Sequence, residues 1–433
     1  MLLPSDEGYV AARMPFNALV QRQPAVIVQC LAVEDVIAAL DFARSNGLPV
    51  SVRGGGHNVA GHAVCDGGVM ISLEHLNRVE VDPTGRIARA SGGTLWRDFD
   101  DATARHCLAA PGGTFGTTGV GGLTLGGGIG FLLGRFGLSC DNLVGAQIVT
   151  ADGRVLETSE DENSELFWGI RGGGGNFGVA TRLDYRLHPI GEVVGGMLVY
   201  AIDGASDVIR SFRDEMATAP DDFTMQMMLT RDADTGAPVA GVIVCNSGPD
   251  EEPPALRRLR ESPHLLEDRV ARIPYRKLQA MLDMPFGLRN YWKGHFVREL
   301  PDELVELLVE RYGALGWPPG ALLIEALHGA ATRVAADATA VSFRAAQFNI
   351  SAIAVWEQPE QDEAEIGWAR ETAASIEPWS VTGGGYLNYM QHDEPLERVR
   401  AAFGAEKFER LRALKRAYDP RNVFNHNQNI PPA

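Results

Sequence analysis

A histidine and an asparagine follow three glycines in the segment PVSVRGGGHN, residues 49–58. The histidine, His57, could serve as a metal ligand, a base, a buried structural group or an attachment point for a cofactor. Glycines permit positive φ angles and bring successive backbone N–H groups together into a concave surface that binds anions. The segment therefore predicts a place where the backbone approaches a ligand closely, with an imidazole beside it.

Two further glycine-rich segments follow, GGTFGTTGVGGLTLGGGIG at 112–130 and RGGGGNFGV at 171–179. One such segment is typical of a structural turn, but three indicate a large ligand that carries phosphate. Residues 173–178, GGGNFG, match the dinucleotide pattern GxGxxG. That pattern requires a strand before it and a helix after it, and here we expect the reverse order. A dinucleotide bound here therefore implies a fold other than the Rossmann fold.

The elements that must position these segments change in character along the chain. Up to about residue 195, short apolar runs such as AVIVQ (25–29) alternate with helical patterns such as AVEDVIAALDFARSNG (32–47). Beyond that point longer strands such as APVAGVIVCNS (237–247) are interleaved with helices such as EAEIGWARETAASI (363–376). The pattern predicts an α+β fold whose second part is an antiparallel sheet covered by helices.

Charge and cysteine usage exclude several classes of function. The 433 residues include 39 basic and 56 acidic ones, so the net charge of −17 should repel nucleic acid and anionic membranes. The first residues lack the pattern of a secretory signal, and no window approaches the length of a membrane span. Five scattered cysteines without a CxxC pair favour reduced thiols and give no zinc site. We expect a cytoplasmic protein that binds neither nucleic acid, membrane nor metal.

Four motifs in this order and spacing are similar to the berberine-bridge-enzyme-like branch of the vanillyl-alcohol-oxidase (para-cresol methylhydroxylase, PCMH) flavoprotein superfamily. They are RGGGHN, TTGVGGLTLGGGIGFLLGRFGLSCDNLVGAQIVTADG, ELFWGIRGGGGNFGVAT and the tail DPRNVFNHNQNIPP. The resemblance covers residues 20–190 and 385–433 closely and the middle in outline. Within the branch, the chain most resembles a group of bacterial hydroxynicotine-oxidase-like members.

The resemblance implies a two-part PCMH-type FAD-binding domain in residues 1–195, completed by 396–433, and an antiparallel-sheet substrate domain in 196–395. It also implies that backbone amides of RGGGHN and of the 112–122 loop hold the pyrophosphate, and that His57 is bonded covalently to the flavin 8α-methyl group. Residues in the tail would bond the isoalloxazine edge, where charge builds in the reduced flavin. The residues implied to bind the cofactor are Arg53, Gly54, Gly55, Gly56, His57, Asn58, Gly61, His62, Gly113, Thr114, Thr117, Thr118, Gly119, Gly121, Gly122, Leu123, Gly126, Asn142, Gly178, Val179, Asn388, Asn427, Gln428 and Asn429.

One position departs from the family pattern. Many relatives carry a second covalent link through a cysteine in a G-x-C-P-x-V-G-V-G-G motif, and here the aligned stretch GTFGTTGVGG places Phe115 at that cysteine. Cys107 and Cys140 lie outside the position. We therefore expect a single covalent bond, to His57. Leu123 stands where relatives often carry a histidine.

The segment GGGYLNYMQHD, 383–393, resembles the family's Y-x-N-Y segment, which implies that a tyrosine near the flavin acts as base. The resemblance also implies a catalytic place for Asn388, beside the flavin ring or the substrate. As a strand, it would direct Tyr386 and Asn388 to one face and Tyr389 to the other. A tyrosine, with an ordinary pKa of about 10, needs a cationic neighbour to act as base near neutral pH. Lys293, in NYWKGHF (290–296), is the candidate to stabilise such a tyrosinate or to bind the substrate. We favour Tyr386 as the base, with Tyr389 as the alternative.

The resemblance, together with these residues, implies an FAD-dependent oxidase that takes a hydride from a C–H bearing a hydroxyl or an amine, while Tyr386 takes the proton. Oxygen would then reoxidise the flavin and yield hydrogen peroxide. The expected substrate is a small molecule, namely a sugar, an alkaloid-like amine or another secondary metabolite, and the protein is expected to be a monomer or small homo-oligomer. A dehydrogenase of the same fold and a flavin-carrying metabolite-binding or resistance protein are the alternatives.

Overall fold

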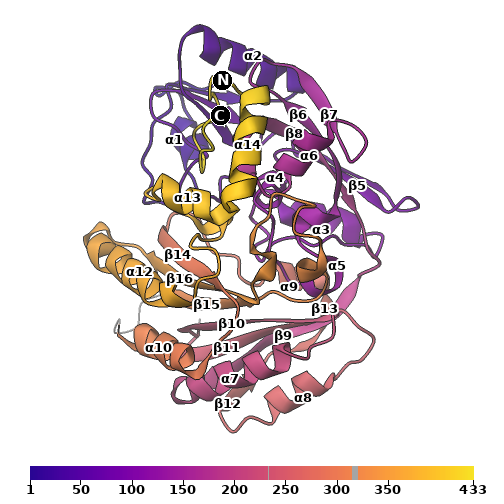
Figure 1. Ribbon diagram of the computed structural model, residues 1–433, viewed down its shortest axis with the longest axis vertical. Coiled ribbons are helices and arrows are strands. Elements are labelled where there is room, and N and C mark those ends of the chain that lie inside the picture. The colour runs from indigo at the N-terminus through magenta and orange to yellow at the C-terminus, as the bar shows by residue number, and fades with distance from the viewer. Residues whose placement is uncertain (233, 315–319) are drawn as a thin grey trace.

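Three sheets organise this computed structural model, which describes residues 1–232, 234–314 and 320–433 (Figure 1). The first is a parallel sheet with the strand order β1-β3-β2. Its strands are β1 (Val26–Gln29), β2 (Val50–Arg53) and β3 (Val69–Ser72). Parallel strands need a crossover connection, and helix α2 (Val33–Ser45) provides it between β1 and β2 while burying Val36 and Leu40. Strand β2 ends at Arg53, so the RGGGHN segment begins at the last residue of this strand.

The second sheet is antiparallel and has the order β4-β5-β8-β6-β7. The other two glycine-rich segments precede its neighbouring strands β6 and β8. Its strands are β4 (Val79–Asp82), β5 (Ile87–Ser91), β6 (Leu143–Val149), β7 (Val155–Thr158) and β8 (Val179–Arg186). Helices α3 (Trp96–Ala104), α4 (Val120–Leu125) and α6 (Ser164–Ile170) accompany it. The GGGNFG segment lies between α6 and β8, so the expected order of helix before and strand after is confirmed.

The third sheet has eight strands, with the order β12-β9-β11-β10-β15-β16-β14 and β13 paired to β9. Its strands are β9 (Glu192–Ala201), β10 (Phe223–Arg231), β11 (Pro238–Asn246), β12 (Leu265–Asp268), β13 (Ala271–Pro274), β14 (Arg289–Val297), β15 (Ala321–Ala326) and β16 (Phe348–Trp356). All its pairings are antiparallel within the described residues. The predicted α+β fold, in which the second part of the chain forms an antiparallel sheet, is therefore confirmed.

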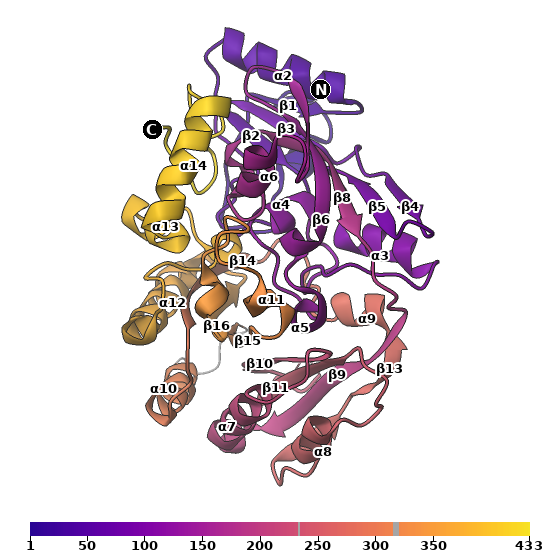
Figure 2. The same ribbon diagram turned by 45° about the vertical axis from the view of Figure 1, so that its right-hand side comes forward.

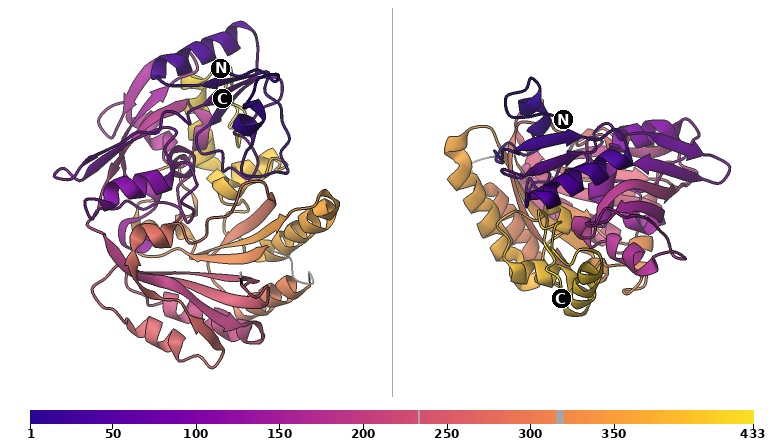
Figure 3. Two further views of the ribbon diagram at one scale, coloured as in Figure 1. Left: turned by 180° about the vertical axis from the view of Figure 1, so that it is seen from behind. Right: turned by 90° about the horizontal axis from the view of Figure 1, so that it is seen from above.

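The two faces of this sheet have different neighbours. Met225 and Met227 of β10 pack in the core formed with helices α7 (Ala205–Met216), α10 (Asp302–Gly313) and α12 (Asp362–Ile376), whereas Met228 packs with Trp292 on the opposite face. Period-two alternation along each strand produces this separation. In Figure 3, seen from behind, the N-terminal sheets lie above the eight-stranded sheet. Trp292 therefore lies on the face of the eight-stranded sheet opposite to helices α7, α10 and α12.

The end of the chain returns to the N-terminal sheets through α13 (Leu396–Phe403) and α14 (Ala405–Tyr418) (Figure 2). On α14, Arg410 forms an ion pair of 2.6 Å with Glu165 of α6 and lies over the ring of Trp168. Helix α14 therefore packs against α6 of the N-terminal part, and the division into domains stays a prediction. The other α-helices are α1 (Tyr9–Arg13), α5 (Leu133–Phe136), α8 (Pro254–Arg260), α9 (Tyr275–Gln279) and α11 (Ala330–Arg333). Among the described residues, none of the helices has the length and apolar character needed to cross a membrane.

A buried ion pair fixes the tail after α14. Lys415 and Asp419 have fully buried side chains, and the ammonium of Lys415 donates hydrogen bonds of 2.8 Å to Asp419 and to the carbonyl oxygens of Asn176 and Phe424. Asp419 also accepts hydrogen bonds from the backbone N–H groups of Val423 and Phe424. Lys415 therefore joins the third glycine-rich segment to the tail that follows it.

We expect Lys415→Met to lower the free energy of unfolding by about 3–5 kcal/mol, because Asp419 would remain buried without its cation. The exposed neighbour Arg416 offers a matched control, and Arg416→Met should change stability by less than about 0.5 kcal/mol. Urea denaturation followed by circular dichroism measures both. Equal stability of the two variants would contradict the anchoring role of Lys415.

Candidate functional site

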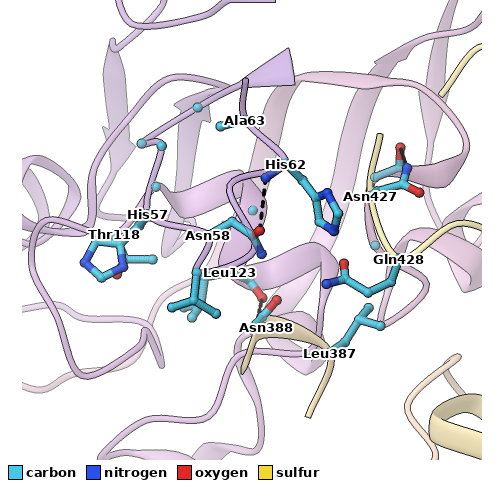
Figure 4. Close-up of a pocket in the computed structure, with 18 of the residues that line it drawn as sticks. His57, Asn58, His62, Ala63, Thr118, Leu123, Leu387, Asn388, Asn427 and Gln428 are labelled. Atoms are coloured by element: carbon cyan, nitrogen blue, oxygen red, sulfur yellow. Dashed lines mark hydrogen bonds between the residues drawn. The ribbon is translucent and has the colours of Figure 1, made fainter. Parts of the chain in front are cut away.

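A cavity lies where the three glycine-rich segments, the tail and residues 386–389 meet (Figure 4). It contains about 1270 Å³ not filled by protein atoms, which includes space open to solvent. Of the residues implied to bind a cofactor, those that line it are Gly54, Gly55, Gly56, His57, Asn58, His62, Thr114, Thr118, Gly119, Gly122, Leu123, Asn388, Asn427 and Gln428. Those outside the described lining are Arg53, Gly61, Gly113, Thr117, Gly121, Gly126, Asn142, Gly178, Val179 and Asn429.

Several of the residues outside the lining have contacts within the protein instead. Arg53 donates to the carbonyl oxygens of Ala12 and Met14, which fixes the N-terminal segment. Asn142 is buried and donates to the carbonyl oxygens of Phe136 and Leu138. These side chains therefore hold the loops around the cavity, and the sequence pattern alone does not distinguish such a role from ligand contact.

Two glycine-rich segments touch backbone to backbone at the cavity wall. A Cβ atom added to Gly55 would lie 2.4 Å from the nitrogen of Gly119, and one added to Gly119 would lie 2.4 Å from the nitrogen of Gly55. Glycine is therefore required at both positions by packing alone. Gly122 and Gly175 differ, because a Cβ there would meet no atom of the described residues within 4 Å, although both line the cavity. Packing within the protein does not explain these two glycines, whereas a ligand lying against the backbone does.

His57 lies between two phenylalanine rings. It stacks on Phe16, with ring centroids 3.9 Å apart and planes at 14°, and its centroid is 5.3 Å from that of Phe115. Burial lowers the pKa of His57 to about 4, so the imidazole is neutral at pH 7. Its Nε2 atom is buried and has no hydrogen-bond partner among the described residues. Phe16 was not identified from the sequence, where no motif marks it.

Further polar atoms without partners lie along the same cavity. His62 Nδ1 and Asn427 Oδ1 are buried and unpaired within the described part of the chain, and both residues line the cavity. Figure 4 shows His62 between Asn58 and Asn427, with its backbone N–H bonded to Asn58. Burial and the charges of His426 and Arg22 lower the pKa of His62 to about 3. An elongated ligand with both donors and acceptors, such as FAD, fits this arrangement.

The segment around Tyr386 is not a strand, so the predicted separation of its side chains onto two faces is wrong. Residues Leu387–Tyr389 form a 3-10 turn, closed by hydrogen bonds from the N–H groups of Tyr389 and Met390 to the carbonyl oxygen of Tyr386. The turn brings the rings of Tyr386 and Tyr389 to 4.8 Å between centroids. Both tyrosines line the cavity.

The hydroxyl oxygen of Tyr386 is surrounded by donors. It accepts hydrogen bonds from the backbone N–H groups of Gly128 (3.0 Å) and Ile129 (3.1 Å) and from the side-chain amide of Asn388 (2.9 Å). Asn388 also donates to the carbonyl oxygen of Leu123, as Figure 4 shows. Burial raises the pKa of Tyr386, and these three donors oppose that rise. Since three donors already occupy the phenolic oxygen, little of it remains open to another partner.

Tyr389 has a different partner, a buried glutamate that sequence reasoning missed. Its hydroxyl donates to Glu325 of β15 at 3.2 Å, and the amide of Asn349 donates to the other carboxylate oxygen at 2.7 Å. Glu325 has no exposed surface, and burial raises its pKa to about 7. A single acidic residue in the otherwise apolar strand ALLIEA was the signal available in the sequence.

Lys293 lies apart from the cavity. The preceding residue, Trp292, lines the cavity, and alternation along β14 directs Lys293 to the opposite face. There its ammonium binds Glu394 at 2.6 Å. The structure therefore does not bring Lys293 to the tyrosines as a cationic neighbour, and backbone amides contact Tyr386 in its place.

Comparison with known proteins identifies the family of the chain. Residues 24–159 match the FAD binding domain family, and residues 385–431 match the family described as berberine and berberine like. The chain is 30% identical to (R)-6-hydroxynicotine oxidase of Paenarthrobacter nicotinovorans, over 100% of this chain and 96% of that protein. It is 27% identical to an FAD-linked oxidoreductase of Dictyostelium discoideum, over 99% of this chain and 93% of the relative.

Solved structures show the same fold. The crystal structure of 6-hydroxy-D-nicotine oxidase from Arthrobacter nicotinovorans superposes with a TM-score of 0.91 and 31% identity, covering 100% of this chain and 97% of that one. Xylooligosaccharide oxidase from Myceliophthora thermophila C1, solved with xylobiose, has a TM-score of 0.87 and 21% identity, covering 100% of this chain and 97% of that one. The chain therefore belongs to the berberine-bridge-enzyme-like family of FAD-linked oxidoreductases.

Proposed function

We propose that the protein is an oxidase that removes a hydride from a C–H bearing an amine or a hydroxyl group of a small organic molecule, with oxygen as the final acceptor. When bound, FAD would supply the hydride acceptor and the reactivity toward oxygen that yields hydrogen peroxide. The observation that carries the proposal is the pair Tyr389–Glu325, a proton acceptor beside an aromatic cavity that the family uses for FAD. Relatives named as oxidases support the choice of oxygen.

The glycine-lined part of the cavity would hold the flavin nucleotide. Backbone N–H groups of residues 54–58 and of the loop before α4 can bind the pyrophosphate, because no Cβ atoms keep it away. The open space beside Gly122 and Gly175 supports this placement. The unpaired atoms of His62 and Asn427 supply further hydrogen bonds to the cofactor.

His57 would anchor the flavin covalently through its 8α-methyl group. A neutral imidazole is nucleophilic, and the low pKa of His57 keeps it neutral at pH 7. The unpaired Nε2 atom is free to form the bond. Phe115 lines the cavity where relatives carry a cysteine, so His57 would be the single attachment.

The geometry favours Tyr389 over Tyr386 as the group that receives the substrate proton. Tyr386 already accepts three hydrogen bonds, whereas Tyr389 makes one hydrogen bond to Glu325. As the substrate proton moves to the oxygen of Tyr389, the hydroxyl proton of Tyr389 can move to the Glu325 carboxylate. An acceptor with a pKa of about 7 is matched to such a transfer near neutral pH.

The walls of the substrate end favour a flat or apolar molecule. Trp292, Tyr389 and Phe115 are adjacent there, with Trp292 and Tyr389 edge to face at 5.0 Å. Aromatic walls of this kind pack well against rings. Because (R)-6-hydroxynicotine is the substrate named for a relative that this chain matches over its whole length, it is the first compound to test, followed by other cyclic amines, benzylic alcohols and sugars.

Anaerobic mixing with this panel tests the proposal. A substrate should bleach the flavin absorbance, and admitting oxygen should restore it within the turnover time and release one hydrogen peroxide per turnover. Slow reoxidation by oxygen, with rapid reoxidation by an artificial acceptor, would identify a dehydrogenase instead. Binding without any bleaching across the panel would favour a metabolite-binding protein.

We expect His57→Ala to release the flavin when the protein is precipitated with acid, because no other covalent bond is predicted. The wild type should keep its yellow colour in the pellet. His62→Ala is the matched control, since it removes another imidazole from the same cavity and should leave the colour in the pellet. Colour retained by His57→Ala would locate the attachment elsewhere.

We expect Glu325→Gln to lower kcat by about 10²–10⁴-fold, the usual effect of losing a general base. A base must be ionised to act, so wild-type kcat/KM should rise with pH to a plateau above about pH 7, and this dependence should disappear in the variant. Glu365→Gln, the same change at a buried glutamate of α12, should leave the profile intact. An unchanged pH profile in Glu325→Gln would exclude Glu325 as the acceptor.

We expect Gly122→Ala to separate stability from cofactor binding. Alanine inside a helix is favoured over glycine by about 0.5–1 kcal/mol, so the flavin-free variant should be as stable as the wild type or more so. Its methyl group would occupy the open space of the cavity, and the flavin content per chain should fall. Gly121→Ala is the control, because its Cβ would lie 3.5 Å from the carbonyl oxygen of Gly92 and outside the lining. Full flavin content in Gly122→Ala would contradict the placement of the cofactor.

A further inference from the structure

Three charged side chains meet behind the turn that carries the two tyrosines. The carboxylate of Glu394 accepts a hydrogen bond of 2.6 Å from the ammonium of Lys293, and its other oxygen lies in ion-pair contact with the guanidinium of Arg398 at 2.9 Å. The exposed fractions of the side chains are 2% for Glu394, 16% for Lys293 and 13% for Arg398. This ionic triad is therefore largely shielded from water, where such pairs are stronger than at a surface.

The triad joins three separate segments. Lys293 belongs to β14, Glu394 follows the tyrosine turn, and Arg398 lies in the first turn of α13. Arg398 also donates to the carbonyl oxygen of Gly294 at 2.8 Å and lies 3.4 Å from the ring nitrogen of His295. The segment after the turn is thus tied to the strand whose Trp292 lines the cavity.

The turn has a second anchor at its other end. There the oxygen of Tyr386 is held by the N–H groups of Gly128 and Ile129, and Asn388 is held by the carbonyl oxygen of Leu123. These partners belong to the glycine-rich segment before β6, whereas Lys293 belongs to the eight-stranded sheet. The turn therefore spans both parts of the protein.

Tyr389 lies between the two anchors, and its hydroxyl makes one hydrogen bond among the described residues, the 3.2 Å contact with Glu325. Glu325 sits on β15, two strands away from β14 in the same sheet. The position of the Tyr389 hydroxyl relative to Glu325 therefore depends on how residues 386–394 are fixed to the sheet. Proton transfer is sensitive to such placement, and a shift of about 1 Å can lower a rate about 10²-fold.

We propose that Glu394 is a positioning residue, which uses Lys293 and Arg398 to hold the tyrosine turn so that Tyr389 stays aligned with Glu325 and the substrate. The proposal rests on the proposed function for its kinetic consequence, but not for its structural one. Among the described residues, Glu394 is not one of those that line the cavity, so its effect passes through Tyr389. Lys293 thereby receives a role different from that of a cationic neighbour of the base.

Glu394→Gln in the flavin-loaded protein is the main test. It removes the anion between two cations, so hydrogen exchange of the peptide covering 386–394 should become at least about threefold faster, and the rate of flavin reduction by substrate should fall about tenfold or more. KM should change by less than about threefold and the pH profile should keep its shape, because Glu394 neither binds substrate nor transfers a proton. Flavin content should stay at the wild-type level.

Arg370→Met is the matched control. Arg370 pairs with Asp393, the residue before Glu394, but its side chain is 55% exposed. Since exposed ion pairs contribute little, neither the hydrogen exchange of 386–394 nor the rate of flavin reduction should change by more than about twofold. Equal effects of Arg370→Met and Glu394→Gln would overturn the proposal, because they would reflect a general loosening of the segment.

Lys293 provides an independent arm in case Glu394→Gln does not fold. Lys293→Met leaves Glu394 paired with Arg398, so the chain should fold and the reduction rate should fall about threefold, while Lys293→Arg should restore it. A changed pH profile in Lys293→Met would assign Lys293 to proton transfer and overturn the proposal. If no compound reduces the flavin, the proposed function fails. The positioning role of Glu394 is then tested by hydrogen exchange alone, and unchanged exchange of residues 386–394 in both Glu394→Gln and Lys293→Met would contradict it.

Discussion

The cavity depends on one close approach, the contact of Gly55 with Gly119. A Cβ at either position would come within 2.4 Å of the other's backbone nitrogen, so no other residue type permits the contact. Residues 64 positions apart in the sequence can meet in this way only because β2 ends directly before the first segment and α4 begins directly after Gly119. Since no side chains lie between the two segments, the space beside them stays open. Gly122 and Gly175, where a Cβ would meet no atom of the described residues within 4 Å, line this space.

The two halves of the protein meet at the turn of Tyr386 and Tyr389. The glycine-rich half holds Tyr386 with backbone amides, while the sheet contacts Tyr389 through Glu325. The two rings are 4.8 Å apart, yet one oxygen is saturated with donors and the other bonds a carboxylate. Two neighbouring tyrosines therefore have different hydrogen-bond partners because they face different halves.

Glu325 and Glu394 show the same principle for acids. Both carboxylates are buried, but the partners of Glu325 are the neutral groups of Asn349 and Tyr389, and burial raises its pKa to about 7. Glu394 forms ion pairs with two cations, Lys293 at 2.6 Å and Arg398 at 2.9 Å. The first is suited to exchanging a proton and the second to holding a segment in place. Lys415 with Asp419 repeats the second case at the tail.

The sequence by itself determined the family, the α+β fold and the glycine-rich wall, because these depend on residue type, order and spacing along the chain. RGGGHN, the fit of GGGNFG between a helix and a strand, and Phe115 at the cysteine position could all be recognised without coordinates. Only the tertiary structure decided the partners of each polar side chain. Glu325 meets Tyr389 across 64 residues, Lys293 meets Glu394 across 101, and Phe16 stacks on His57, contacts that no local pattern encodes. The tyrosine turn departed from the expected strand because hydrogen bonds to distant backbone groups, rather than alternation, fix its conformation.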